Sequence, residues 1–264
     1  MPGRIRVGIG GWTYDPWRDN FYPAGWPKAR ELEYASAHVT AIEINGTYYS
    51  TQKPATWADW AKRTPDDFVF AVKASRFCTN RRVLAEAGES IAKFVNQGLA
   101  ELGPKLGPIL WQFMGTKAFD AEDFGAFLKI LPASVGGIPL RHAIEPRHES
   151  FRDPAFLALA KQAGVAIVFA DAEDHPQFAD PTTDFIYARL QDARPDVPTG
   201  YDDAALDRWA DVAGQWAKGD APAGFSYIGK PEPAAAARDV FVFMINGAKE
   251  RAPAAAQALI GRLG

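Results

Sequence analysis

Eight short runs of β-type residues alternate with amphipathic helical segments along this chain, and this alternation constrains its fold more than any other feature. The predicted strands are residues 5–12, 40–47, 67–74, 107–113, 139–146, 165–171, 184–191 and 239–246. The predicted helices are residues 27–38, 54–63, 81–101, 120–131, 154–163, 204–218 and 252–263. Eight strands, each followed by a helix except for a weak one after the sixth, predict a parallel sheet that closes into a single TIM-type (β/α)8 barrel over residues 1–264.

Three segments do not fit the alternation and are predicted to be loops: residues 172–183, where a helix is missing after the sixth strand, 192–203 and 219–238. The length of 264 residues suits one barrel, because this fold typically uses about 250. An open doubly wound sheet is the alternative. Against it, the glycines Gly8, Gly10 and Gly11 do not have the G-x-G-x-x-G spacing and do not precede a helix.

Charge and cysteine content narrow the classes of partner and compartment. The net charge is −3 and the isoelectric point about 5.9, so no basic field favours nucleic acid or an anionic membrane. The single cysteine, Cys78, excludes an intrachain disulfide and a cysteine metal cage. No targeting segment precedes the first strand, and no run of about 18 apolar residues occurs. We therefore expect a soluble, cytoplasmic protein.

Polar side chains occur at the last inward positions of seven of the eight predicted strands. Side chains alternate between the two faces of a strand, so the apolar residues that pack against helices fix which neighbours point into the barrel. The sixth strand is predicted to direct Asp171 inward with Phe169, and the eighth to direct Asn246 inward while Phe243 and Ile245 face the helices. The complete predicted inward set is Glu43, Asn45, Lys73, Gln112, Glu145, Arg147, Asp171, Tyr187, Arg189, Gln191 and Asn246. Active sites of this fold lie at that end of the barrel, so the set predicts a ligand pocket.

The charges of this set favour a small anionic or polyhydroxylated ligand. Three carboxylates (Glu43, Glu145, Asp171) can each pair with one of three cations (Lys73, Arg147, Arg189), so no metal is required. The expected catalytic residues are Glu145, as general acid or base, with Lys73 and Glu43. The expected ligand-binding residues are Trp12, Asn45, Tyr49, Gln112, Arg147, Asp171, Arg189 and Asn246.

Other chemistry stays open at this point. Mg²⁺ or Mn²⁺ on the three carboxylates is an alternative to the metal-free site. A Schiff base on Lys73 needs a depressed pKa, which two neighbouring carboxylates would oppose. Among the histidines, His148 is the one placed for chemistry, because it follows Glu145 and Arg147 closely.

Several motifs resemble the YecE-like family, a domain of unknown function (number 72). They are GIGGWTYDPWRDNFYPAGWP, AIEINGTYY, FVFAVKAS, GPILWQF and IEPRHESF, and they cover nearly the whole chain. The resemblance implies a TIM barrel without an assigned activity. It also implies a pocket lined by Gly11, Trp12, Glu43, Asn45, Thr47, Tyr49, Lys73, Gln112, Glu145 and Arg147.

The chain departs from the family pattern at four places. Asn80 and Gln191 stand where the family usually has histidine, and Gly247 stands where it often has asparagine. The fourth strand ends in Gln112-Phe113-Met114-Gly115 instead of Gln-x-Pro-Pro. If the family's chemistry needs either histidine, this chain is altered in activity or substrate.

Three functions therefore remain in competition. The first is an enzyme, a hydrolase, lyase or isomerase, that binds a small anionic or polyhydroxylated metabolite and uses Glu145 as general acid or base. The second is a non-catalytic ligand-binding barrel, which the missing histidines suggest. The third is a metal-dependent hydrolase that processes nucleic acid, which the acidic isoelectric point disfavours.

Overall fold

The computed structural model describes residues 2–18, 20–230 and 236–264. Its strands and α-helices are, in chain order, β1 (Ile5–Gly10), α1 (Glu31–His38), β2 (Ala41–Ile44), α2 (Pro54–Lys62), β3 (Val69–Lys73), α3 (Arg76–Thr79), α4 (Gly88–Val95), β4 (Leu106–Gln112), α5 (Ala121–Lys129), β5 (Ser134–Val135), β6 (Ile138–Pro139), β7 (His142–Glu145), α6 (Pro154–Ala163), β8 (Ala166–Ile167), β9 (Phe169–Asp171), β10 (Phe185–Leu190), α7 (Asp203–Lys218), β11 (Asp239–Met244) and α8 (Ala252–Leu263). Short 3₁₀ helices lie at Asp15–Trp17, Lys28–Arg30, Gly46–Tyr48, Leu84–Ala87, Leu99–Lys105, Glu149–Phe151 and Lys249–Arg251. Part of the predicted loop 219–238, residues 231–235, lies outside the described residues.

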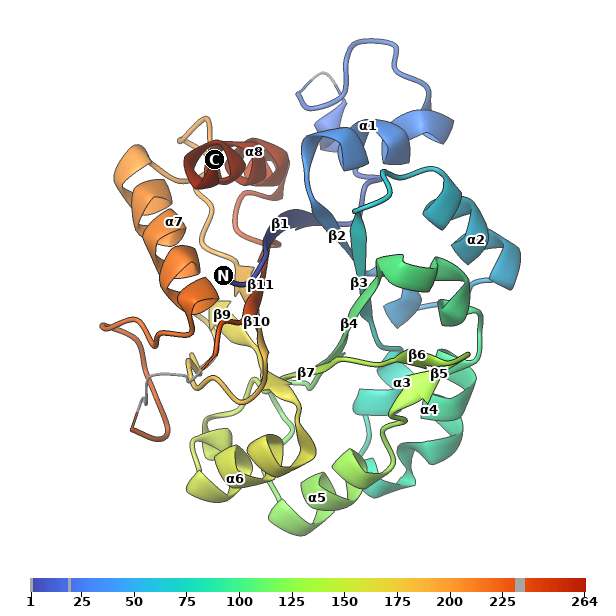
Figure 1. Cartoon of the computed structure of the whole chain (residues 1–264), viewed down its shortest axis with the longest axis vertical. Coiled ribbons are helices and arrows are strands. Elements are labelled where there is room, and N and C mark those ends of the chain that lie inside the picture. The colour runs from blue at the N-terminus through green and yellow to red at the C-terminus, as the bar shows by residue number, and fades with distance from the viewer. Residues whose placement is uncertain (1, 19, 231–235) are drawn as a thin grey trace.

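The main sheet is parallel and closes on itself. Its order is β8-β7-β4-β3-β2-β1-β11-β10-β9, and only Val168 separates β8 from β9. The first half of this interrupted strand pairs with β7 and its second half with β10, so the sheet begins and ends on the same stretch of chain. Figure 1 shows the strands as an inner ring with the helices outside it. The predicted (β/α)8 barrel is confirmed.

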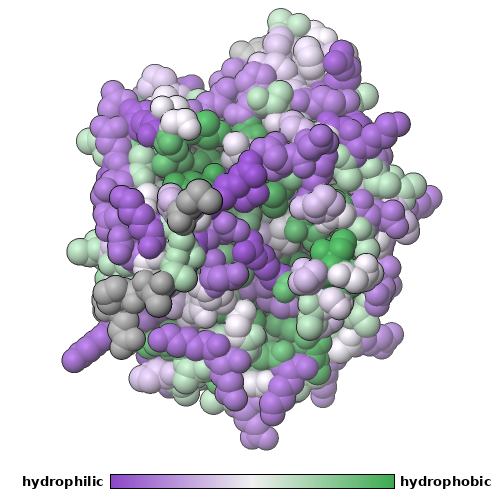
Figure 2. Space-filling view, in the orientation of Figure 1, coloured by the Kyte–Doolittle hydropathy of each residue, from purple (hydrophilic) through white to green (hydrophobic). Residues whose placement is uncertain are grey.

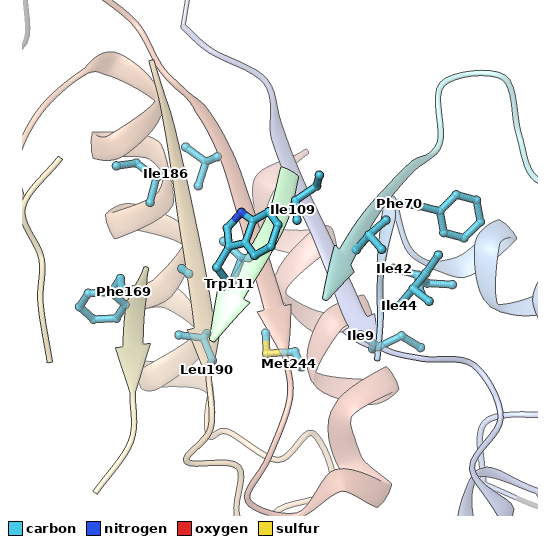
Figure 3. Close-up of a cluster of buried hydrophobic side chains, with 14 of the residues drawn as sticks. Ile9, Ile42, Ile44, Phe70, Ile109, Trp111, Phe169, Ile186, Leu190 and Met244 are labelled. Atoms are coloured by element: carbon cyan, nitrogen blue, oxygen red, sulfur yellow. The ribbon is translucent and has the colours of Figure 1, made fainter. Parts of the chain in front are cut away.

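Two separate apolar layers hold the barrel together. Side chains on the outer face of the strands pack against the helices, and Figure 3 labels several of them, among them Ile42, Phe70 and Trp111. A second cluster fills the interior: Ala41, Val69, Ala71, Leu110, Ala143, Ala166, Val168, Phe185, Tyr187, Phe241, Phe243 and Ile245. Alanines on four of the strands leave room for the aromatic rings of β10 and β11. The inside of the barrel is therefore a packed core beneath the polar end, not a channel.

Local signals in the sequence account for the clearest helix boundaries. Asp153 accepts a hydrogen bond from the backbone N–H of Ala155 and Pro154 occupies the first turn, so α6 begins there. At its other end Gly164 has φ 63°, the left-handed conformation that glycine adopts without strain.

The predicted helix 81–101 is wrong in extent. The structure has a 3₁₀ turn at Leu84–Ala87, α4 at Gly88–Val95 and another 3₁₀ segment at Leu99–Lys105. Gly98, with φ 125°, ends the regular helix, and Pro104 prevents its continuation toward β4. The antiparallel pair β5–β6 was also not predicted. Its turn is Gly136-Gly137, both at positive φ.

The inward phase predicted for two strands is wrong. In β9, Phe169 packs against Trp209 and Trp216 of α7, so it faces the helices. In β11, Phe243 lies 5.1 Å from the ring of Tyr187 inside the barrel, and Met244 belongs to the outer layer. Both strands are apolar on each face, so their sequences carry no alternation to show which face is inward.

Hydrophilic residues cover most of the surface seen in Figure 2, and hydrophobic residues form separate patches between them. Among the described helices, none has the length and apolarity needed to cross a membrane.

Candidate functional site

Arg189 forms the buried centre of the polar end of the barrel. It is the second-last residue of β10, and its side chain lies between two carboxylates that are fully buried. Its Nε and Nη2 donate to Glu43 at 3.0 and 3.1 Å, and its Nη1 donates to both oxygens of Glu145 at 2.9 and 2.7 Å. Tyr187 donates its hydroxyl to Glu43 at 2.7 Å. One arginine thus ties strands β2, β7 and β10 together beneath the pocket.

Glu145 has further partners that keep it ionised. Gln112 donates to its Oε2 at 2.9 Å, and Arg147 donates to its Oε1 from Nε at 2.9 Å and from Nη2 at 2.7 Å. Burial alone would raise the pKa of Glu145, but the charges of Arg189 and Arg147 lower it to about 2. A general acid or base works best with a pKa near the working pH. The geometry therefore favours a positioning role for Glu145 over the predicted proton transfer.

Lys73 is a partly buried amine at this site, and its pKa is shifted well below that of an ordinary lysine. Its Nζ donates to Oε1 of Gln112 at 2.8 Å and lies 4.4 Å from the centre of the Tyr48 ring. Burial lowers the pKa of Lys73 and the charge of Arg189 lowers it further, to about 8, although the two carboxylates oppose the shift. The two carboxylates oppose the shift, as the sequence predicts, but burial and the charge of Arg189 outweigh them.

The pocket above this network is small and carries cationic groups. Its volume is about 300 Å³, at the lower end of the range for small-molecule sites. It is lined by Gly10, Asn45, Tyr49, Lys73, Gln112, Arg147, Arg189, Ile245, Asn246 and Lys249. Of these described lining residues none is acidic, because both buried glutamates lie below Arg189. The charged side chains at the pocket wall are therefore all cations, and three amides, Tyr49 and Ile245 accompany them.

Lys249 is a lining residue that the sequence reasoning missed. It lies in the 3₁₀ turn after β11, and its Nζ is 4.6 Å from the centre of the Tyr14 ring. Burial lowers the pKa of Lys249. Lys249 lies three residues beyond Asn246 in a 3₁₀ turn, where no strand alternation predicts the direction of a side chain.

Six of the predicted ligand-binding residues line the pocket: Asn45, Tyr49, Gln112, Arg147, Arg189 and Asn246. Asn246 lines the pocket even though the inward and outward faces predicted for its strand are wrong. The reason is that β11 ends at Met244, so the alternation of the strand does not set the direction of Asn246. Its Nδ2 donates to Oε1 of Gln191 at 3.3 Å.

Trp12 and Asp171 are not brought into the pocket. Trp12 packs edge-to-face on Trp60 of α2, with ring centres 5.0 Å apart, and also contacts Phe70. Asp171 lies two residues after Phe169 and therefore on the same outward face of β9. Burial and the charge of Asp192 raise the pKa of Asp171. The inward orientation predicted for Asp171 is wrong.

His175, not His148, lies beside the carboxylate network. Its Nε2 is 3.9 Å from Oε1 of Glu145 and 3.4 Å from Nε2 of Gln191, and its Nδ1 is 2.5 Å from Asp174. The predicted loop 172–183 folds this side chain inward until it is 4% exposed. His148 instead accepts a hydrogen bond from the backbone of Ser150 and caps a 3₁₀ turn. A histidine in an irregular loop gives no periodic signal by which the sequence could have revealed its direction.

The other departures from the family pattern have structural partners here. Asn80 donates to the hydroxyl of Tyr48 at 2.9 Å, so it braces the ring that faces Lys73. Gly247 has φ 79°, and a Cβ there would lie 2.4 Å from the carbonyl oxygen of Ala193. The backbone therefore requires glycine at this position.

The carboxylates are not free to gather around a cation. Arg189 occupies oxygens of both Glu43 and Glu145, and Asp171 faces away. Within the described ranges, no group of three or more His, Cys, Asp or Glu side chains is placed to hold a metal ion.

Comparison with known proteins gives one family match and several similar structures. The model of the family described as "Protein of unknown function DUF72" matches residues 6–264. The UPF0759 protein YunF of Bacillus subtilis is 28% identical over 158 residues, 58% of this chain and 54% of YunF, so the match spans about half of that relative. A DUF72 family crystal structure from Enterococcus faecalis has a TM-score of 0.72 at 19% identity, covering 98% of this chain and 95% of the other. One from Thermotoga maritima has a TM-score of 0.71 at 20% identity, covering 97% of each chain. At these identities the likeness of the structures shows a shared fold.

Proposed function

This chain belongs to the DUF72 family of proteins of unknown function, and we propose that it is an enzyme for a small anionic metabolite. DUF72 is the YecE-like family that the sequence motifs resemble, so that resemblance is confirmed. The observation that carries the proposal is the lining of the 300 Å³ pocket, which includes the cations Lys73, Arg147, Arg189 and Lys249. A carboxylate or phosphate group matches these donors in charge and in hydrogen-bonding geometry.

The cations have different roles in this proposal. Arg189 is held by two carboxylates and forms a fixed floor. Arg147 uses Nε and Nη2 on Glu145, so its Nη1 is available to an anion at the mouth. Lys249 adds a positive charge from the opposite side of the pocket. A rigid set of donors of this kind binds an anion without first having to be ordered, which favours affinity.

Lys73 is the residue to which we assign proton transfer. A pKa of about 8 leaves both its protonated and its neutral form populated near neutral pH, as acid–base catalysis requires. Its hydrogen bond to Gln112, which in turn donates to Glu145, holds the amine at the pocket wall. Glu43 and Glu145, predicted from the sequence as catalytic, act through Arg189 and Gln112 and are positioning residues. The chemistry of these side chains uses no metal.

Binding of inorganic phosphate and acetate, measured by isothermal titration calorimetry beside glucose as an uncharged comparator, tests the anion site. Arg147→Ala removes a charge-assisted donor, and we expect phosphate binding to weaken by about tenfold or more. Lys249→Ala should also weaken it, without disturbing the carboxylate network.

Arg194→Ala is the matched control. Arg194 follows β10 at the same end of the barrel and pairs with exposed Asp196, so its removal changes the charge of this face but not the pocket. If Arg194→Ala weakened phosphate binding as much as Arg147→Ala does, the effect would come from the overall charge of this face and not from the pocket. Binding of glucose but of neither anion would overturn the anion site.

A further inference from the structure

A second cavity of about 490 Å³ lies beside the cationic pocket. It opens between the segment after β2, the segment after β3 and helix α4, and its lining includes Tyr49, Ser50, Ser75, Phe77, Ser90 and Phe94. Tyr49 lines both cavities, so the second one continues outward from the first. A ligand whose charged group occupies the cationic pocket therefore has room to extend in this direction.

Aromatic faces are exposed in this second cavity. Four large hydrophobic residues are exposed in the described part of the chain, and the two most exposed are Tyr49 at 68% and Phe77 at 60%. Both line the second cavity, and both are aromatic. Exposed aromatic rings gathered at a pocket mouth point to a contact made with a partner, because folding alone would bury them.

Aromatic rings lie along the way from the cationic pocket to the second cavity. The Lys73 amine lies over the Tyr48 ring, which meets the Tyr49 ring edge-to-face with centres 5.0 Å apart. Tyr49 then leads to Phe77 across the second cavity. A planar group attached to a bound anion would pass along these rings.

Hydroxyl groups on the walls add hydrogen-bond donors to this apolar face. Ser75 accepts from the backbone N–H of Phe77, and Ser90 accepts from Nη2 of Arg81. In each case the oxygen is occupied as an acceptor, which leaves the hydroxyl hydrogen to donate to a ligand. The cavity therefore suits a planar ring with polar edges better than an aliphatic chain.

We propose that this cavity is a ring-binding subsite, so that the ligand is an anion joined to a planar ring that stacks on Tyr49 and Phe77. This rests on the proposed function, since the anionic group of the same ligand occupies the cationic pocket. The combined size of the two cavities is that of a small molecule, which favours a metabolite over a protein segment as the occupant.

Calorimetric titration with inorganic phosphate and with phenyl phosphate tests the subsite. The wild-type chain should bind phenyl phosphate about 3 to 10 times more tightly than phosphate, as stacking of one ring on aromatic side chains implies. Phe77→Ala should reduce this ratio to less than about twofold and leave the phosphate affinity unchanged. Phe77 is exposed, so its substitution does not open the core.

Val83→Ala is the control, since Val83 is an exposed apolar residue on the same side of the barrel that lines neither cavity. It should leave the ratio as in the wild type. Equal binding of phosphate and phenyl phosphate by the wild type would overturn the subsite while the anion site stands. A ratio that survives Phe77→Ala, or one lost equally in Val83→Ala, would also overturn it. Binding of neither compound would overturn the proposed function, and the subsite with it.

Discussion

Replacing Arg189 by methionine should show how strongly one buried cation holds the mouth of the barrel together. Methionine keeps much of the volume of the side chain and removes its charge. In the variant Glu43 keeps its hydrogen bond from Tyr187, and Glu145 keeps Gln112 and Arg147. Both carboxylates stay fully buried, but Glu43 loses its ion-pair partner and Glu145 loses one of its two.

Two routes give the size of the effect. Removing one partner of a buried ion pair costs about 3–5 kcal/mol, because the remaining charge is left without compensation. Separately, the pKa of Glu145 lies near 2 against an ordinary 4.5, which corresponds to about 3 kcal/mol of folding free energy at neutral pH. Arg189 is the larger of the two charges that lower this pKa. We therefore expect Arg189→Met to lower the free energy of unfolding by about 3–4 kcal/mol at pH 7.5.

The pH dependence separates this cause from a loss of packing. In the wild type the stabilisation from Glu145 is complete above its unfolded pKa and is lost as pH falls toward about 2. In the variant, Arg189 no longer offsets the burial that raises the pKa of Glu145, so part of the destabilisation is relieved when Glu145 binds a proton as pH falls. The difference in unfolding free energy between wild type and variant should therefore narrow between pH 7.5 and pH 5.

Urea unfolding followed by far-UV circular dichroism measures these free energies. Adding Glu43→Gln and Glu145→Gln to Arg189→Met should restore much of the stability at pH 7.5, since no buried carboxylate remains and Arg147, which loses its partner, is partly exposed to solvent. Arg194→Met, at an exposed site, should change stability by less than about 0.5 kcal/mol. A deficit that stays constant with pH and is not restored by the glutamines would refute the electrostatic explanation.

Two further predictions concern the pocket amine and a backbone constraint. Sulfate affinity should fall as pH rises through about 8, because Lys73 loses its charge there. Calorimetric titrations from pH 7 to 9.5 measure this dependence, and Lys73→Met should abolish it. An unchanged dependence of affinity on pH in that variant would exclude Lys73 as the titrating group. Gly247→Ala should destabilise the protein by about 2 kcal/mol or more in urea unfolding, because its Cβ would meet the backbone of Ala193. Gly25→Ala, at φ 74° but with nothing within 4 Å of the added Cβ, should lose only about 1 kcal/mol, and equal losses would contradict the steric argument.

The barrel and much of its polar end could be predicted because alternation is visible in the sequence of most strands. Apolar residues such as Ile42 and Ile44 on one face fix Glu43 on the other, and the same reasoning places Lys73, Gln112 and Arg189 correctly. Nothing comparable exists where a strand is apolar on both faces. In those strands the prediction of which side chains point inward rests on one polar residue, Asp171 or Asn246. Each of these residues lies at or beyond the end of its strand, where the alternation no longer holds.

The sequence alone does not show which charged group transfers protons, because the pKa of a side chain depends on its surroundings as well as on its residue type. Glu145 looked like the acid–base group, yet four hydrogen-bond donors from Arg189, Arg147 and Gln112 surround its oxygens and fix it as an anion. Lys73 is predicted from the sequence as catalytic beside two carboxylates that oppose a depressed pKa, yet burial outweighs them in the structure. Arg189 has the largest part in this difference, since its charge lowers the pKa of Glu145, which keeps that group ionised, and also lowers the pKa of Lys73. The position of Arg189 depends on three strands meeting across the barrel, which no local pattern in the sequence records.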